Sequence, residues 1–463
     1  MRPTRWRRST HIVIGLAVLV LVAALVAVAA VFTMGGRSTS DAQTVPPAPP
    51  LATADPGVTP VSDSAPKPTP DELAATLAPA LADPNLGNLT GRITDAITGT
   101  QLWAQGADIP MQPASTTKVL TAAAALLTLD RDARITTRVM AADQQKAPGL
   151  VVLDGGGDPT LSAAPKGQDT WYRDAARISD LAEQVRRSGI KATAVQVDVS
   201  AYSGPTMAQG WDPIDIEGGD IAPMEPVMLD GGRTQPVSVE SKRSVTPALD
   251  AGRALAVALG VDPAAVTVLP AAFKGNEIAS VQSPPLTERL REMMNNSDNV
   301  MAESIGREVA AELGRPQSFD GTARAVLGRL ESAKIDTGGS KLVDASGLSV
   351  DDRLTAETLD EVVNAAAGND QPPLRPLLDL LPIAGGSGTL SNRYLDNDAE
   401  RAAAGWLRAK TGSLTATNAL AGIVTDASGR VLTFALISNN AGPTGRIAID
   451  TLAATLRSCG CST

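Results

Sequence analysis

The sequence predicts an α/β protein in which helices flank an antiparallel sheet, with an inserted domain and a membrane segment at the N-terminus. Three observations support this architecture. Residues 12–32 form an uninterrupted apolar run that is long enough to span a bilayer. The segment that follows residue 115 is apolar around its whole circumference, as expected of a buried helix. Two apolar runs near the C-terminus, separated by a short polar turn, have the pattern of a β-hairpin.

The N-terminal residues indicate a cytoplasmic stub and anchor (residues 1–34) followed by a tether (residues 35–75). Arginines precede the apolar run, so the positive-inside rule places the rest of the chain outside the cytoplasm. The tripeptide at residues 27–29 resembles a signal-peptidase site, and cleavage there would give a secreted protein. The length of the run favours a retained anchor. Residues 35–75 are rich in Pro, Ala, Thr and Ser, which predicts a disordered tether.

The rest of the chain divides into one discontinuous domain and one insertion. Residues 89–104 indicate two strands around a turn, and a buried helix is predicted from Ser115 to Leu129. Residues 139–280 change to short strands, Gly/Pro loops and two amphipathic helices, which predicts an inserted domain. Helical patterning resumes near residue 287, so residues 76–138 and 281–463 are expected to form a single domain.

The C-terminal region is expected to complete the sheet. Residues 420–425 and 431–437 are apolar strands joined by a turn, and a final helix covers residues 446–456. The only cysteines, Cys459 and Cys461, are so close in sequence that a disulfide between them would be strained. A frayed tail is therefore expected, with a tail disulfide or an intermolecular link as alternatives.

Charge and histidine content exclude several classes of function. The formal net charge is −10, and without the N-terminal arginines it is −14, which argues against a nucleic-acid partner. The single histidine, His11, lies beside the apolar run. A Ser-His-Asp triad and a His-ligated catalytic zinc are therefore excluded. A nucleophilic enzyme with this sequence must take its base from Lys, Asp, Glu or Tyr. No motif implies a metal or an organic cofactor.

Ser115 and Lys118 are the first candidate pair. Their i, i+3 spacing places both side chains on one helix face. A neutral lysine could take the serine proton if burial and a nearby cation removed its charge. The S-x-x-K pattern alone is weak, because the chain contains two more copies, at residues 64–67 in the tether and 188–191 at a helix end. Neither of those copies begins a buried helix.

Two further motifs follow along the chain. The tripeptide Ser-Asp-Asn at residues 297–299 would, by itself, be an ordinary helix cap. Lys-Thr-Gly occurs once, at residues 410–412, just before the predicted hairpin and on an expected strand edge. Gly412 would allow close approach of a ligand backbone. In this order, S-x-x-K, S-D-N and K-T-G are the signature of class A β-lactamases and penicillin-binding proteins.

The sequence resembles the low-molecular-mass class C penicillin-binding proteins, the D-alanyl-D-alanine carboxypeptidase/endopeptidase family, over roughly residues 75–457. Besides the motifs, residues 155–161 (GGGDPTL), 344–349 (DASGLS) and 382–390 (PIAGGSGTL) match that family. The 182 positions between Ser115 and Ser297 far exceed the gap in single-domain β-lactamases and match the family's inserted domains. The resemblance implies a β-lactamase/penicillin-binding-protein transpeptidase-like fold.

The resemblance also implies roles for the motif residues. Ser115 would attack the carbonyl of the penultimate D-alanine, Lys118 would be the general base, and Ser297 would relay a proton to the departing amine. Asn299 would hold the peptide side of the substrate and the Lys118 network. The terminal carboxylate would be bound by the third motif and the residue after it, namely Lys410, Thr411, Gly412 and Ser413.

Further expectations concern the surroundings of these residues. The backbone N–H groups of Ser115 and Ser413 would form the oxyanion hole. The charge of Lys410 would help to depress the pKa of Lys118. Ser346 and Ser349 would line the acceptor side. Leu414 stands where some relatives carry Met, which leaves the side-chain preference of the pocket open.

Three functions fit the motifs. The first is a D,D-carboxypeptidase that trims peptidoglycan stem peptides through an acyl-serine, cuts crosslinks by the same chemistry, and binds β-lactams covalently. The second is a β-lactamase, against which the insertion and tether argue. The third is a non-catalytic, tethered wall-binding protein, against which the intact signature argues. In each case, residues 12–32 would hold the chain in the cell membrane with residues 35–463 outside.

Overall fold

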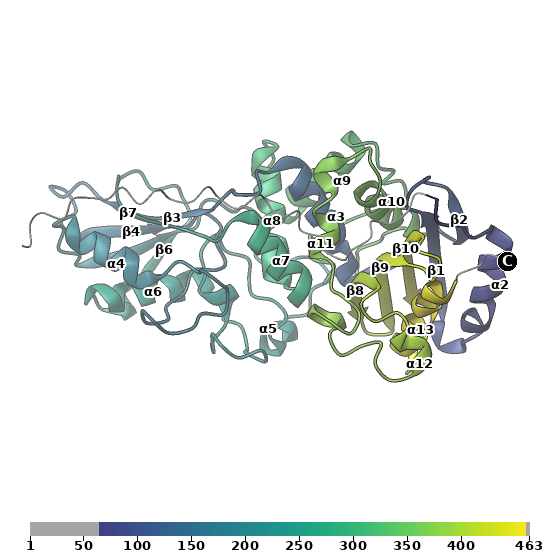
Figure 1. Cartoon of the computed structure of the whole chain (residues 1–463). Coiled ribbons are helices and arrows are strands. Elements are labelled where there is room, and N and C mark those ends of the chain that lie inside the picture. Colours follow the sequence, from purple (N-terminus) through teal and green to yellow (C-terminus); the bar gives the residue numbers. More distant parts are fainter. Residues whose placement is uncertain (1–63, 460–463) are drawn as a thin grey trace, which may run out of the picture. The chain divides into compact units, whose positions relative to one another are not determined.

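The computed structural model describes residues 64–459. The predicted anchor at residues 12–32 and the tether up to residue 63 lie outside this range. Within the described range, no helix is both long enough and apolar enough to cross a membrane. The described residues build two five-stranded sheets, each with its own flanking helices (Figure 1).

The first sheet is antiparallel throughout and joins the two ends of the described chain. Its strand order is β2-β1-β10-β9-β8, and Arg92 of β1 lies opposite Ala435 of β10. The strands are β1 (Asn88–Asp95), β2 (Gln101–Gln105), β8 (Leu407–Leu414), β9 (Thr417–Thr425) and β10 (Val431–Asn439). The expected antiparallel sheet and C-terminal hairpin are confirmed.

Alternate residues of β10 face two separate cores, as the period of a strand requires. Leu432, Phe434 and Leu436 pack with helices α2 (Pro70–Leu81) and α13 (Gly445–Ser458). Ala435 and Ile437 point the other way, into a helical layer. That layer consists of α3 (Thr117–Thr128), α7 (Leu286–Asn296), α8 (Asn299–Glu312), α9 (Phe319–Ser332), α10 (Ala356–Ala367) and α11 (Leu377–Leu380). Helices therefore cover both faces of the sheet.

Helix α3 is the buried helix expected after residue 115. Its residues from Thr117 to Leu126 are all buried, and four consecutive alanines, residues 122–125, let the neighbouring helices approach closely. The helix begins at Thr117, two residues later than predicted, because residues 114–116 form a tighter 3₁₀ turn. That turn carries Ser115.

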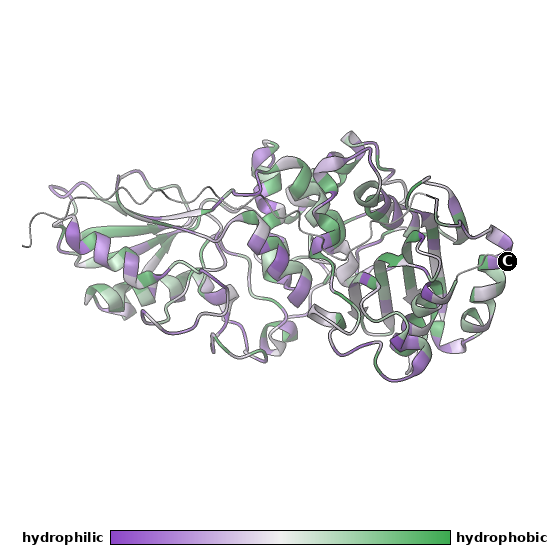
Figure 2. Cartoon of the chain, in the orientation of Figure 1, coloured by the Kyte–Doolittle hydropathy of each residue, from purple (hydrophilic) through white to green (hydrophobic). Residues whose placement is uncertain are grey.

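The second sheet is mixed and is formed by the segment between the first and second motifs. Its order is β6-β5-β4-β3-β7, with β4–β5 and β5–β6 parallel and the other pairs antiparallel. The strands are β3 (Thr136–Ala141), β4 (Leu150–Asp154), β5 (Ala194–Asp198), β6 (Thr267–Leu269) and β7 (Asn276–Gln282). Helices α4 (Ile178–Arg187) and α6 (Pro247–Leu259) share an apolar core with it. Figure 2 shows these strands coloured mainly as hydrophobic.

At both ends of the described chain, the favoured expectation is wrong. The tether was expected to reach residue 75, but α2 begins at Pro70, because Thr69 and Glu72 form a capping box and Leu73 is buried. The tail was expected to fray, with a disulfide as the alternative. At Cys459, the C-cap of α13, the alternative holds, because this residue is buried in the core and disulfide-bonded; residues 460–463 lie outside the described range. The remaining short helices are α5 (Ile214–Gly218) and α12 (Asp398–Arg401).

Candidate active site

Ser115 lies on a strained turn directly before α3. Ala114, the preceding residue, has a left-handed φ of 48°, which is unfavourable for a residue with a Cβ atom. Strand β8 packs against this turn at Gly412, where an added Cβ would lie 2.7 Å from the carbonyl oxygen of Pro113. The prediction that Gly412 allows close approach of a ligand stays a prediction, and the structure gives this glycine another reason. This glycine lets β8 approach the turn that carries the serine.

The side chain of Lys118 is fully buried behind Ser115 and is surrounded by three oxygens. Its Nζ lies 3.0 Å from Ser115 Oγ, 2.6 Å from Asn299 Oδ1 and 2.7 Å from the carbonyl of Ser346. The amide of Asn299 is oriented by its Nδ2, which donates to the carbonyl of Asp220 at 3.0 Å. Two of the three oxygens around Nζ can therefore only accept hydrogen bonds.

This geometry suits a neutral lysine. A neutral amine has two N–H groups and one lone pair. If the N–H groups serve Asn299 Oδ1 and the Ser346 carbonyl, the lone pair faces the hydroxyl of Ser115. Burial lowers the pKa of Lys118 to about 8, against the opposing effect of buried carboxylates, of which Asp344 is the strongest.

The second motif forms the junction between two helices. Ser297 is the C-cap of α7 with a left-handed φ of 55°, Asp298 is the N-cap of α8, and Asn299 is the first residue of α8. The first two residues of the motif are therefore helix caps, and only Asn299 lies within a helix. Ser297 Oγ accepts a hydrogen bond from Lys410 Nζ at 3.0 Å.

The third motif lies on β8, which is the edge strand of the first sheet, as predicted. Lys410 is fully buried, and burial together with the positive charge of Lys118 holds its pKa well below the usual value. The expected effect of Lys410 on the pKa of Lys118 stays a prediction, because burial and nearby carboxylates are the main influences on Lys118. The hydroxyls of Thr411 and Thr389 are 2.8 Å apart.

A cleft of about 790 Å³ opens over these residues. Five of the eight predicted site residues line it, namely Ser115, Ser297, Asn299, Thr411 and Ser413. The other three, Lys118, Lys410 and Gly412, do not line it, but each lies next to a residue that does. The structure thus gathers residues separated by almost 300 positions of sequence.

Ser346 and Ser349 do not line the cleft, contrary to expectation. Both are fully buried, and the hydroxyl of Ser349 donates to the carbonyl of Gln209. Ser346 reaches Lys118 through its backbone carbonyl alone. The loop is held by Asp344, which accepts from three backbone N–H groups of residues 346–349 and from the indole N–H of Trp211. Neither Asp344 nor Trp211 was predicted as a site residue from the sequence, although Asp344 begins the stretch at residues 344–349 that matches the family.

The inserted segment also contributes to the cleft. Asp212, Asp215 and Asp220 of this segment line it, together with Arg393 and Arg446 from the C-terminal part of the chain. Burial, followed by the charge of Asp220, raises the pKa of Asp215. These residues belong to loops or helix starts without periodic pattern, so no local signal in the sequence could have found them.

Fold and site together are those of a penicillin-interacting serine hydrolase. The chain belongs to the D-Ala-D-Ala carboxypeptidase 3 (S13) family, whose model matches residues 73–245 and 237–456. The resemblance to low-molecular-mass class C penicillin-binding proteins is thereby confirmed, and the protein is a serine-type D-Ala-D-Ala carboxypeptidase. A second model, for the N-terminal domain of carboxypeptidase Rv3627c-like proteins, matches residues 1–60.

Similar proteins agree with this assignment. The chain is 75% identical to carboxypeptidase DacB of Mycolicibacterium smegmatis and 64% identical to carboxypeptidase Rv3627c of Mycobacterium tuberculosis, with 100% of each chain covered. The crystal structure of penicillin binding protein 4 (dacB) from Haemophilus influenzae has the same fold, with a TM-score of 0.67 at 23% identity. That match covers 84% of this chain and 98% of the other.

Proposed function

We propose that Ser115 is the nucleophile and Lys118 the general base of a D,D-carboxypeptidase that removes terminal D-alanine from peptidoglycan stem peptides. The observation that carries this proposal is the arrangement around Lys118 Nζ, in which two obligate acceptors leave the lone pair directed at the Ser115 hydroxyl. Lys118 takes the hydroxyl proton as Ser115 Oγ bonds to the carbonyl carbon of the penultimate D-alanine.

The other motif residues act on the two ends of the scissile bond. The peptide nitrogen of the terminal D-alanine leaves with the proton that Lys118 took, relayed through the hydroxyl of Ser297. Asn299 binds the peptide side, and Lys410, Thr411 and Ser413 bind the terminal carboxylate. The N–H groups of Ser115 and Ser413 stabilise the oxyanion, each contributing about 3 kcal/mol. Water then releases the acyl group from Ser115.

The proposal also covers peptidoglycan crosslinks as substrates and the location of the protein in the cell. D,D-crosslinks carry the same bond with a longer leaving group, so the same residues would cut them. The four arginines followed by the apolar run at residues 12–32 support anchoring in the cell membrane, with the catalytic residues on the extracytoplasmic side. The residues directly before the possible cleavage site at residues 27–29 are apolar, which supports a retained anchor over cleavage.

Covalent labelling tests the nucleophile. The full-length chain, in detergent, is incubated with a fluorescent penicillin and followed by mass spectrometry. We expect a long-lived adduct on Ser115, no adduct in Ser115→Ala, and an unchanged adduct in Ser188→Ala. Ser188 begins the other described S-x-x-K copy, and its hydroxyl bonds locally, donating to the carbonyl of Val185 and accepting from the N–H of Ile190. A peptide ending in D-Ala-D-Ala should release D-alanine. Failure of the wild type to form an adduct would overturn the proposal, and rapid loss of the adduct would favour a β-lactamase.

A further inference from the structure

The middle residue of the second motif, Asp298, does not face the cleft. Its side chain is only 2% exposed, and both carboxylate oxygens have partners. Oδ1 accepts from the backbone N–H of Met301 at 3.0 Å, which caps helix α8. Oδ2 accepts from the hydroxyl of Tyr172 at 2.7 Å. A buried carboxylate with this set of donors is held in one position.

The side chains that contact the Asp298 carboxylate come from the segment between the first two motifs. Tyr172 is 1% exposed and packs into the helical core around α3 and α8. Arg233 lies 4.0 Å from the carboxylate, donates to the Tyr172 hydroxyl at 3.4 Å, and stacks on the ring of Trp171 with its guanidinium carbon 3.8 Å from the ring centre. Tyr172 and Arg233 therefore form a chain of contacts that ends on Asp298.

The charge balance around Asp298 depends on the same segment. Burial by itself would raise the pKa of Asp298, but Arg243 and then Arg233 hold it below the usual value. Both arginines belong to the inserted segment. The carboxylate is thus anionic and able to accept from Tyr172, whose own pKa is raised by burial and by Asp298, so that its hydroxyl remains a donor.

The contacts that hold Asp298 matter more for the position of Ser297 than for that of Asn299. Asn299 is held independently, through Asp220 on one side of its amide and Lys118 on the other. Ser297 has a left-handed backbone, and among the described contacts its hydroxyl bonds only to Lys410. The N–H groups of Ser297 and Asp298 both donate to the carbonyl of Met293, and the side chain of Asp298, the next residue, is held by Tyr172.

We propose that Tyr172 and Arg233 are positioning residues for acyl transfer, acting through Asp298 to keep the Ser297 hydroxyl where it can protonate the leaving amine. This inference rests on the proposed function. It makes the inserted segment part of the machinery of the reaction, since it supplies the contacts that hold the proton relay. The bonds made and broken are those of the acylation step above.

A comparison of leaving groups tests the inference. An amide nitrogen must gain a proton to depart, whereas a thiolate departs without one. The full-length protein is assayed with a D-Ala-D-Ala peptide and with the matching thioester. For Tyr172→Phe, which keeps the ring, we expect kcat/KM on the amide to fall about tenfold, the effect of one lost hydrogen bond to a charged group. On the thioester, it should change less than about twofold.

Matched variants make the result specific. Tyr202→Phe is the control, since Tyr202 is a second inserted-segment tyrosine that stacks on an arginine, but its hydroxyl contacts the carbonyl of Gly157 and the side chain of Ser304 rather than the second motif. It should behave as wild type on both substrates. Arg233→Lys keeps the charge and loses the stacking, and should show the same amide-selective loss as Tyr172→Phe. It provides a second test if Tyr172→Phe does not fold.

Two outcomes overturn the inference. Either Tyr172→Phe and Arg233→Lys match Tyr202→Phe, or they lose activity equally on both substrates, as a general structural defect would. The proposed function has a separate readout, because Ser115→Ala must release no D-alanine. If Ser115→Ala is inactive while Tyr172→Phe is unaffected, the positioning role of Tyr172 is rejected and the assignment of Ser115 as the nucleophile is kept.

Discussion

At the scale of single residues, the chemistry depends on how one lysine loses its charge. Lys118 is fully buried, and burial is the main cause of its lowered pKa, which is about 8. Nearby buried carboxylates raise the pKa, so they partly offset the lowering caused by burial. A base with such a pKa is partly neutral near physiological pH, whereas a free lysine is almost fully charged.

The pKa of Lys118 predicts a pH profile. Because only the neutral amine accepts the Ser115 proton, the rate of acylation by penicillin should rise about tenfold per pH unit below pH 8 and level off above it. Stopped-flow acylation of the full-length protein between pH 6 and 9 measures this. Lys118→Arg should abolish acylation, since a guanidinium keeps its proton. A flat profile would show that Lys118 is not the base.

At the scale of elements, catalysis requires that β8 lies directly against the serine turn. Gly412 makes this possible, because any side chain there would meet the Pro113 carbonyl at 2.7 Å and the Ser115 nitrogen at 3.2 Å. The edge strand and the turn belong to segments about 300 residues apart. Their contact brings the third motif to the nucleophile.

Gly412→Ala should therefore impair the enzyme through displacement of the serine turn. We expect a loss in kcat/KM on the order of 100-fold, as for other small misplacements of reacting groups. Gly328→Ala is the matched control, because this glycine lies within helix α9 and an added Cβ would be 3.7 Å from the nearest side-chain atom. It should keep full activity and gain up to about 1 kcal/mol in stability. Equal activity in the two variants would contradict the prediction.

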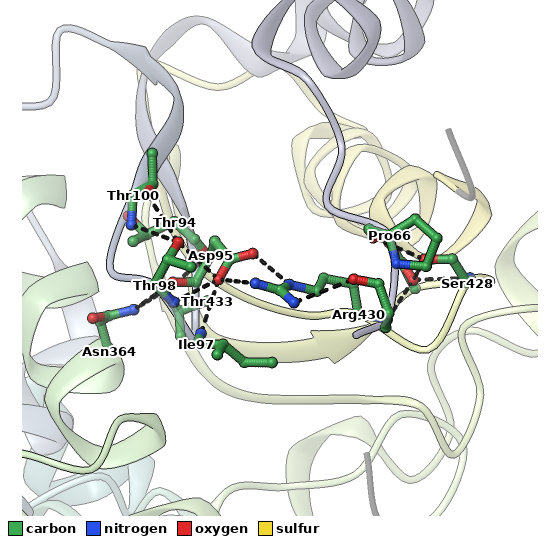
Figure 3. A network of polar contacts seen from close by, with 12 residues as sticks. Pro66, Thr94, Asp95, Ile97, Thr98, Thr100, Asn364, Ser428, Arg430 and Thr433 are labelled. Atoms are coloured by element: carbon green, nitrogen blue, oxygen red, sulfur yellow. Dashed lines mark hydrogen bonds and ion pairs between the residues drawn. The ribbon is translucent and has the colours of Figure 1, made fainter. Parts of the chain in front are cut away.

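At the scale of the whole described chain, a buried ion pair closes the end of the first sheet (Figure 3). Arg430, at the β9–β10 turn, donates to both oxygens of Asp95 at the end of β1, at 2.5 and 2.8 Å. Burial raises the pKa of Asp95, but the hydrogen bond from Arg430 holds it below the usual value. Arg430 and Ser428 also donate to the carbonyls of Ala65 and Pro66, so the same cluster holds the first described residues.

Removal of this arginine should be costly for folding. Arg430→Met leaves the Asp95 charge buried without its partner, and we expect a loss of about 3–5 kcal/mol in the free energy of unfolding. Arg324→Met removes the exposed pair with Asp320 and should cost less than about 1 kcal/mol. Urea denaturation of both variants measures the difference. Similar midpoints would mean that the buried pair contributes little.

The sequence by itself determined the local features of the protein. The spacing of Ser115 and Lys118 places both side chains on one helix face, apolar runs separated by a turn predict the C-terminal hairpin, and the single histidine excludes the common triad. These inferences hold because each depends on residues close in the chain or on simple counts. Stretches that match the family, such as residues 344–349, indicated further parts of the site, but the sequence did not show which contacts these residues make.

Only the tertiary structure decided how these parts meet. It showed that Lys118 faces two obligate acceptors, that Lys410 bonds to Ser297, and that Gly412 serves the serine turn. It also showed that Tyr172, from the inserted segment, supports the second motif. The physical reason is that helix and strand periods record which side of an element is buried, whereas the partner that buries it is chosen by packing between segments far apart in sequence.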